Sequence, residues 1–466
     1  MVFSSIIFLF IYLTAVIAIY SVTPLRWRNA MLLFANLIFY GWGEPKLIIL
    51  MVVSTLVNYI GGLVIEKNRE RERVAKGALI ASVVISLGLL AFFKYTDFAI
   101  ENLRLLPFLS FLEPLKVTLP IGISFYTFQT MSYTIDVYRG DVAAQKSIVK
   151  FGTYVSFFAQ LIAGPIVRYQ DIADQMDDRR RNLAQFASGV QRFVIGFAKK
   201  ILLANTVGEL WNMAAATPAA QMTTLGAWIG MLAFSFQIYF DFAGYSDMAI
   251  GLGRMFSFEF LENFNYPYIS QSVTEFWRRW HISLGTWFRE YVYIPLGGNR
   301  HGIWKQLRNI LIVWALTGIW HGASWNFALW GLYYAALLML EKLFLLRVLG
   351  KTPRVVRHIY TLLAVVVGWT LFANTDLSAC LQMLGAMFGF AQGGLVAAGD
   401  LYVLRNAAVL LLIAAIASTP LMAKGFGRLP EKGRDVLLPL LIAGGLLISV
   451  AYLVNATYNP FLYFRF

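Results

Sequence analysis

The sequence is poor in charged residues and rich in apolar ones. Of its 466 residues, only 14% are charged and 59% are hydrophobic, whereas about a quarter of the residues of an average soluble domain are charged. One water-soluble core could not bury so many apolar side chains. A lipid bilayer must therefore act as the solvent for much of the chain.

Cysteine and histidine are also scarce, with one Cys and four His in the whole chain. Cys380 has no partner for an intrachain disulfide, and a zinc site made of several Cys ligands is excluded, so we expect no metal. The net charge of +14 would suit nucleic acid, but Lys and Arg also gather in cytoplasmic loops and at lipid headgroups. No basic run is long and separate from apolar segments. We therefore expect membrane lipids, and no nucleic acid, as partners.

The motifs of several soluble enzyme classes are missing. The sequence contains no G-x-S-x-G nucleophile elbow, no H-E-x-x-H zinc motif and no G-x-x-x-x-G-K-[ST] phosphate loop. Neither His281 nor His321 has an acidic residue five positions later, as the soluble His-x-x-x-x-Asp acyltransferases would require. Cys380 lies in an apolar stretch with no nearby His, so we interpret it as a packing residue.

Apolar runs occupy most of the chain, but several are shorter than the ~20 residues that a full span needs. We therefore predict an all-α polytopic membrane protein with about 11–13 transmembrane, tilted or re-entrant helices. The polar connections are too short for a soluble domain, and no internal repeat is visible, so we expect a single domain, residues 1–466. The first run has no preceding basic region and no cleavage site after it, which predicts a retained span rather than a signal peptide. The runs lie near residues 3–20, 30–42, 47–65, 78–94, 118–135, 147–166, 186–204, 223–250, 308–320, 325–346, 359–373, 403–421 and 436–454.

The distribution of basic residues predicts an orientation. The loop from Glu66 to Lys76 is rich in Lys and Arg, and Arg26 and Arg28 follow the first span. Because cytoplasmic loops carry an excess of positive charge, we expect the loops after the first and third spans to be cytoplasmic. The N-terminus would then face the periplasm or the outside.

The segment from Val273 to Tyr291 has a different pattern. Its apolar residues follow the i, i+3, i+4, i+7 spacing of one helical face, while its charged residues lie outside that face. An aromatic face opposite a basic one is typical of a helix that lies in the membrane interface. We predict such an amphipathic helix, with His281 at the edge of its apolar face. The apolar residues are Phe276, Trp277, Trp280, Leu284, Trp287, Phe288 and Tyr291.

His321 lies between two apolar runs. An ionisable side chain at membrane depth is costly and by default indicates a function. A neutral imidazole can act as a general base at pH 7, although a histidine that merely packs helices would leave the same pattern. Gly318 and Gly322 flank it as a small-xxx-small pair, which serves close helix packing or leaves room for a substrate.

Asp241 and Asp247 also lie in an apolar region. Six positions apart, they point about 120° apart on a regular helix, so a carboxylate pair is not expected. Buried carboxylates must be paired. We interpret them as partners for buried Arg or His residues, or as hydrogen-bond anchors in a broken helix.

Several long motifs closely resemble the membrane-bound O-acyltransferase (MBOAT) family, and more narrowly its bacterial branch, typified by the membrane subunit of alginate O-acetylation. The resemblance runs nearly from end to end. The motifs are Met1-Val-Phe-Ser-Ser5, Leu119-Pro-Ile-Gly-Ile-Ser-Phe125, Leu161-Ile-Ala-Gly-Pro-Ile166, Tyr239-Phe-Asp-Phe-Ala-Gly-Tyr-Ser-Asp-Met-Ala-Ile-Gly251, Asn265-Tyr-Pro-Tyr-Ile-Ser270, Trp277-Arg-Arg-Trp-His-Ile-Ser283, Tyr293-Ile-Pro-Leu-Gly-Gly-Asn-Arg300, Trp320-His-Gly322 and Tyr458-Asn-Pro-Phe461.

The resemblance implies helices arranged around a tunnel, with His321 catalytic and His281 important for activity. It implies an acyl thioester donor, such as acetyl-CoA, and no bound cofactor. The acceptor would be an exported polysaccharide, reached directly or through a periplasmic SGNH-type acetyltransferase, and the location would be the bacterial inner membrane.

The residues themselves suit such a reaction. A base must take the hydroxyl proton, for which neutral His321 is suitable, and a donor must stabilise the oxyanion. Basic side chains would bind the phosphates of a thioester donor, although headgroup anchoring explains them equally well. We expect Arg278, Arg279, Trp280, Arg289 and Arg300 to bind the donor, and Asp241, Asp247, Trp320 and Gly322 to be structural or to line the tunnel.

Two other functions fit the same pattern. One is a transporter or flippase of a polymer or acyl group, with His321, Asp241 and Asp247 as a charge relay. The other is a non-catalytic membrane scaffold for a periplasmic transferase. The missing internal repeats count against the transporter.

Overall fold

The computed structural model describes residues 3–161, 164–177, 179, 182–455 and 462. Over these residues the regular structure is helical, without strands, as predicted. The chain forms two compact units: residues 1–193 with 246–261, and residues 194–245 with 262–466. The Tyr458–Phe461 motif, and Met1 and Val2 of the opening motif, lie outside the described residues.

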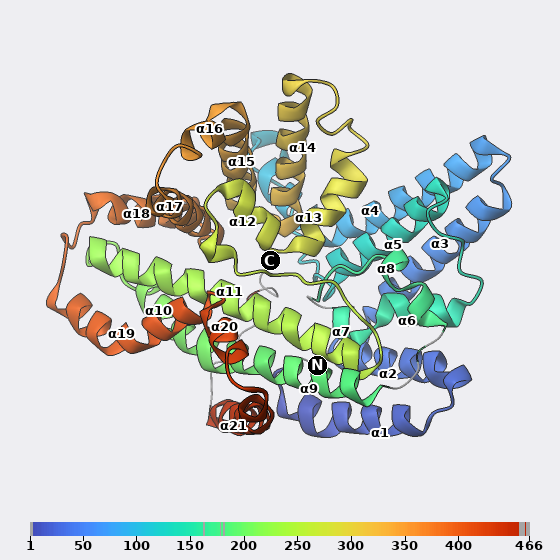
Figure 1. The fold of residues 1–466 in the computed structure, drawn as a ribbon. Helices are drawn as coiled ribbons and strands as arrows, with labels where there is room; N and C mark the ends of the chain where they lie inside the picture. Colours follow the sequence, from blue (N-terminus) through green and yellow to red (C-terminus); the bar gives the residue numbers. More distant parts are fainter. Residues whose placement is uncertain (1–2, 162–163, 178, 180–181, 456–461, 463–466) are drawn as a thin grey trace. The chain divides into compact units, whose positions relative to one another are not determined.

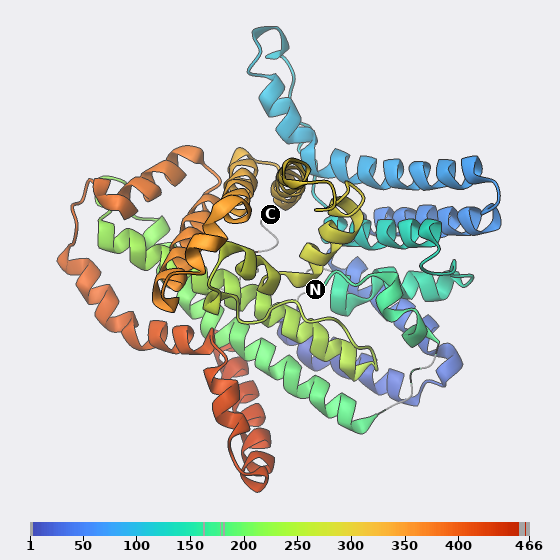
Figure 2. The same ribbon diagram turned by 45° about the horizontal axis from the view of Figure 1, so that its top comes forward.

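The first unit has an aromatic core. The rings of Phe8, Tyr12, Phe39 and Phe158 have centroids 5.5 to 6.2 Å apart, in stacked, tilted and edge-to-face arrangements. Three of its helices, α3, α4 and α5, lie side by side (Figures 1 and 2). The helices of this unit are α1 (Thr14–Val22), after a π-helical segment (Ile7–Leu13), α2 (Arg28–Gly43), α3 (Ile48–Lys67), α4 (Glu72–Leu103), α5 (Ile123–Arg139), α6 (Ile148–Ser156), α7 (Phe158–Leu161) and α8 (Tyr169–Ile172).

The second unit contains all the histidines. Two helices are divided between the units. In α9 (Leu183–Ala198), the residues up to Phe193 belong to the first unit and the rest to the second. In α11 (Thr224–Met255), the residues up to Tyr245 belong to the second unit and the rest to the first. The remaining helices are α10 (Asn205–Ala215), α12 (Val273–Arg279), α13 (Ile282–Phe288), α14 (Ile303–His321), α15 (Trp325–Leu340), α16 (Leu346–Leu349), α17 (Arg354–Ala373), α18 (Leu377–Gly385), α19 (Ala398–Ala417), α20 (Leu421–Gly427) and α21 (Glu431–Asn455).

Each of the thirteen apolar runs contains a helix. Within the described residues, six helices are by length and composition able to cross a membrane: α3, α4, α11, α17, α19 and α21. The run near 118–135 becomes helical only at Ile123, because Gly122 before it has a left-handed φ of 75°, a conformation that glycine adopts without strain. The run near 147–166 is interrupted at Phe157, whose ψ of 112° is not helical.

The prediction of one continuous helix from Val273 to Tyr291 is wrong. Helix α12 ends at Arg279, Trp280 is extended, and His281 has a left-handed φ of 47° before α13 begins at Ile282. The predicted apolar face is not presented to a membrane surface either: Phe276, Trp280 and Leu284 are buried within the second unit. The break turns the chain so that both short helices contribute aromatic residues to this core.

Helices α14 and α15 form a closely packed hairpin (Figure 1). A Cβ atom on Gly318 would lie 2.5 Å from the carbonyl oxygen of Phe327 and 3.2 Å from the Cα atom of Gly331, and one on Gly322 would overlap the Phe327 ring. Both predicted small residues therefore serve close packing. The hairpin fixes the position of His321 at its turn.

Candidate functional site

His321 is the last residue of α14. Gly322 follows in an extended conformation, so the helix ends directly after the histidine. The imidazole is 7% exposed and lies edge-on to Trp330 and Phe372, with ring centroids 4.9 and 5.3 Å away. The structure therefore surrounds a titratable ring with aromatic side chains from α15 and α17.

His281 lies at the break between α12 and α13 and is 3% exposed. Its Nδ1 atom is 3.1 Å from Oδ1 of Asn263, and its ring packs edge-on against Phe242 of α11 at 4.7 Å. Burial disfavours the charged imidazolium and lowers the pKa of His281 to about 3. At pH 7 this histidine is neutral.

A cavity of about 800 Å³ brings the two histidines together with basic residues. Arg278, Arg289 and Arg300, which were expected to bind a donor, line it, and all three are exposed. Trp280 and Lys342 line it too. The cavity thus combines a water-accessible cationic rim with buried imidazoles, an arrangement suited to a phosphate-bearing ligand.

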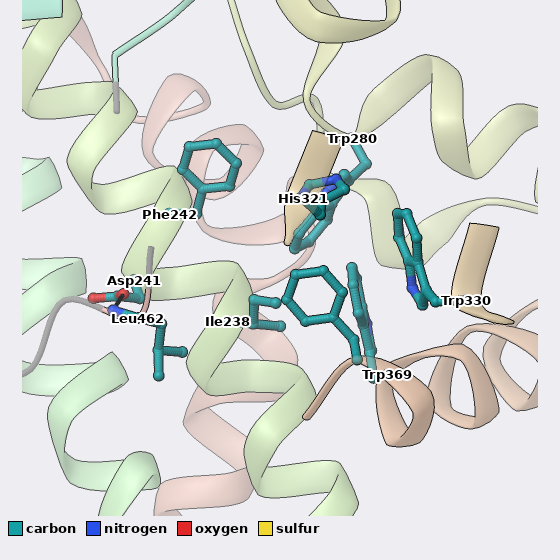
Figure 3. Close-up of a pocket in the computed structure, with 9 residues that line it drawn as sticks. Ile238, Asp241, Phe242, Trp280, His321, Trp330, Trp369 and Leu462 are labelled. Atoms are coloured by element: carbon teal, nitrogen blue, oxygen red, sulfur yellow. Dashed lines mark hydrogen bonds between the residues drawn. The ribbon is translucent and has the colours of Figure 1, made fainter. Parts of the chain in front are cut away.

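A second, small cavity of about 20 Å³ lies on another side of His321. Trp280 and His321 line both cavities. Figure 3 shows Asp241 beside Leu462 at one end of the small cavity and Trp330 at the other. The rest of its lining is apolar: Ile238, Phe242, Trp369 and Phe372.

Four of the predicted site residues line neither cavity and are held elsewhere. Arg279 binds Glu275 at 2.9 Å and donates to the carbonyl oxygen of Asn265. Trp320 is buried, with its ring 5.0 Å from the ring of His321. Gly322 packs against Phe327, and Asp247 belongs to the first unit.

The two carboxylates of α11 are each paired with a cation, although the partner of Asp241 is a lysine and not the expected Arg or His. Asp241 binds Lys200 at 2.5 Å and accepts a hydrogen bond from the backbone N–H of Leu462 at 2.9 Å. Asp247 binds Arg192 at 2.6 Å. Because each charge is compensated locally, the carboxylates act as anchors within their own units.

Sequence reasoning missed several residues around the site. Lys200 lies inside an apolar run, and an ionisable residue there is a signal that could have been used. Glu341 and Lys342 directly follow the apolar helix α15, where a charged pair marks a helix end. Asn263 carries no such signal, because its role depends on a contact with a residue eighteen positions later.

The site can support acyl transfer. Such a reaction needs a base for the hydroxyl proton, a binding surface for the donor and an environment that excludes bulk water. The buried imidazoles, the cationic rim and the aromatic wall correspond to these needs. Among the described residues, no group of three His, Cys, Asp or Glu side chains is placed to hold a metal ion.

The helical membrane fold and the histidine-lined cavity are suited to an acyltransferase of the membrane. A family model described as MBOAT, the membrane-bound O-acyltransferase family, matches residues 115–383, and the chain belongs to this family. It is 39% identical to the probable alginate O-acetylase AlgI of Pseudomonas putida over the full length of both chains.

Two further relatives support the same class. The chain is 44% identical to the probable alginate O-acetylase AlgI of Azotobacter vinelandii, over 84% of this chain and 79% of that protein. It is 34% identical to the peptidoglycan O-acetyltransferase of Helicobacter pylori, over 79% of this chain and 75% of that protein. The resemblance predicted from the motifs is confirmed: the chain is a membrane O-acyltransferase of the alginate O-acetylation branch.

Proposed function

We propose that the chain moves an acetyl group from a cytoplasmic thioester donor toward hydroxyl groups of an exported polysaccharide, with His321 as the general base. The observation that carries this proposal is the position of His321, which lines both the large basic cavity and the small aromatic one. His321 can therefore contact a donor bound in the large cavity, and the small cavity marks the side from which an acceptor hydroxyl would approach. The proposed location is the bacterial inner membrane.

The donor is acetyl-CoA or another acyl thioester. Arg278, Arg289, Arg300 and Lys342 line the large cavity, and their charges suit the phosphates of such a donor. The thioester end would then extend inward toward Trp280 and the histidines.

The acceptor is a hydroxyl group of an alginate-like or other cell-envelope glycan, or a periplasmic SGNH-type acetyltransferase that completes the transfer. Relatives named as alginate and peptidoglycan acetylating enzymes support a polysaccharide. His321 removes the proton as the hydroxyl oxygen attacks the thioester carbonyl. The carbon–sulfur bond then breaks, and the thiol leaves with a proton.

The test is acetyl transfer by the purified chain in liposomes, with radiolabelled acetyl-CoA and an alginate oligosaccharide. A general base contributes about 10²–10⁴-fold to the rate, so His321→Ala should lose at least 100-fold in kcat. His301→Ala is the matched control, because His301 is an exposed loop histidine outside both cavities.

Both variants must also keep the gel-filtration profile and thermal unfolding midpoint of the wild type. Turnover at the wild-type rate by folded His321→Ala would refute the role of His321. Acetylation of the oligosaccharide only after a periplasmic fraction is added would identify the acceptor as a partner protein.

A further inference from the structure

Asn263 is a fully buried residue that contacts both His281 and the start of α13. Its Oδ1 atom accepts hydrogen bonds from the backbone N–H and the hydroxyl of Ser283, at 3.1 and 2.9 Å. Its backbone carbonyl oxygen accepts from the N–H of Ile282 at 3.0 Å. One side chain from a distant segment therefore caps α13, whose own N-cap residue, His281, provides no side-chain cap.

The hydrogen bonds from Ser283 also determine which atom is the donor in the contact between Oδ1 of Asn263 and His281. The backbone N–H of Ser283 can only donate, so the atom of the Asn263 amide that faces it must be the oxygen. That oxygen can only accept. The Nδ1 atom of His281, 3.1 Å away, must therefore carry a proton.

We infer that Asn263 is a positioning residue that holds His281 as the neutral Nδ1–H tautomer, so that Nε2 carries the lone pair. A ring in this state accepts a proton or a hydrogen bond at Nε2 and does not donate from it. The consequence for catalysis rests on the proposed function. In acyl transfer, His281 would accept a hydrogen bond or a proton and would not donate a hydrogen bond to the oxyanion.

The groups that surround His281 include no acid that would stabilise its charged form among the described residues of the large cavity. The titratable groups that share the large cavity with it are Arg278 from α12, Arg289 and Tyr293 from the segment after α13, Arg300, His321 from α14, and Lys342 from the segment after α15. Phe242 of α11 adds an apolar contact. Four basic side chains and no carboxylate line this cavity among the described residues, and burial is the cause of the lowered pKa of His281.

The tautomer is measurable without turnover. The chain has four histidines, so ¹⁵N-histidine labelling gives four imidazole spin systems, and loss of one in His281→Gln assigns His281. We expect the wild-type proton on Nδ1 throughout pH 6–8. A proton on Nε2 in the wild type would overturn the inference.

Asn263→Ala removes the acceptor and should give a mixture with the proton on Nε2. Ser283→Ala is the matched control, because it removes one donor to the same Oδ1 atom and leaves His281 bonded to it. The control should keep the wild-type tautomer. An unchanged tautomer in Asn263→Ala would contradict the role of Asn263, even if both variants were destabilised alike.

Asn263→Asp separates positioning from folding, because its carboxylate still accepts from Ser283 and His281. The negative charge stabilises the imidazolium and should raise the pKa of His281 by about 1–3 units. Because an imidazolium cannot accept a proton, the acetyl-transfer rate of Asn263→Asp should fall at acidic pH, below the raised pKa of His281, where the wild type still turns over. A merely structural residue would change the rate equally at every pH.

The two proposals fail in different ways. If His321→Ala retains transfer, the proposed function is refuted while the tautomer result stands. If transfer depends on His321 but the pH profile of Asn263→Asp equals that of the wild type, the role of Asn263 is refuted alone.

Discussion

Arg278 and Arg279 are neighbours in the sequence, but they have different environments. Arg278 is exposed and lines the large cavity, whereas Arg279 is held by Glu275 and by the backbone of Asn265. Only one of them is therefore placed to meet a ligand. The pair offers a comparison in which charge, size and position in the sequence are almost constant.

Arg278→Ala should raise the KM for acetyl-CoA about tenfold, the equivalent of about 1.4 kcal/mol, with little change in kcat. The effect should shrink as salt is added, because ions screen an exposed contact between an arginine and a phosphate. Initial rates at two ionic strengths measure both quantities. Arg279→Ala, which loses an i,i+4 ion pair worth about 0.3–0.5 kcal/mol of stability, should leave the KM within twofold, and an equal rise in both variants would contradict this assignment.

The sequence alone singled out ionisable residues in apolar runs, because burying a charge is costly. His321, Asp241 and Asp247 stood out in the sequence because ionisable groups in apolar runs need a reason. Both carboxylates have cationic partners, but that of Asp241 is Lys200 and not the expected Arg or His. The cavity lining was less predictable. Glu275 lies four residues before Arg279, a spacing that favours an ion pair on a helix, but which arginine lines a cavity depends on contacts that are distant in sequence.

At the scale of elements, Glu341 connects two helices. The side chain is buried, and its oxygens accept from the backbone N–H groups of Val273 and Thr274 at 2.7 and 2.8 Å, at the start of α12. Tyr360 of α17 donates to the same carboxylate. This carboxylate, just after α15, therefore caps the short helix that leads to Trp280 and His281.

Glu341→Gln should lower the free energy of unfolding by about 2–3 kcal/mol. The amide presents an N–H₂ group to one of the two backbone donors, and hydrogen bonds to charged groups contribute about 1.5–3 kcal/mol. Urea unfolding in detergent, followed by tryptophan fluorescence, measures the loss. The control is Glu431→Gln, at an exposed position in the first turn of α21. Its free energy of unfolding should stay within about 0.5 kcal/mol of the wild type. An equal loss of stability in both variants would show that the Glu341 cap is unimportant.

The failure to predict the break between α12 and α13 has a physical explanation. The segment from Val273 to Tyr291 has helical periodicity and no Gly or Pro at the break point, so local preference favours one helix. Contacts with Asn263 and the aromatic core stabilise a left-handed His281 instead. Such contacts are distant in sequence, and periodicity cannot reveal them.

At the scale of the whole molecule, hydropathy located the long helices, because every apolar run contains a helix, but helices such as α10 and α18 lie outside these runs. The long helices differ in how much of them the protein covers: 72% of the apolar window of α11 is buried, but only 6% of that of α21. An apolar helix that the protein leaves uncovered needs lipid around it. Helix α21 is therefore the element most dependent on the bilayer.

Leu441→Arg, at an exposed position near the middle of α21, should reduce membrane insertion, because an arginine at the centre of a span costs about 2.5–3.5 kcal/mol. The measurement is the fraction of expressed chain that remains in carbonate-washed membranes. Leu429→Arg, in the turn before α21, is the control and should insert like the wild type. Equal recovery of both variants would mean that α21 lies outside the hydrocarbon region.

The small cavity beside His321 has a consequence for the energy balance of the cell. Its volume of about 20 Å³ holds about one water molecule, and tryptophan and phenylalanine rings form most of its wall. A continuous file of water, along which protons or ions could leak, cannot form through such a space. If acetyl groups pass His321 as proposed, they would cross the membrane without a leak of protons or ions. Acetylation of an external polymer would then not dissipate the gradient that drives ATP synthesis.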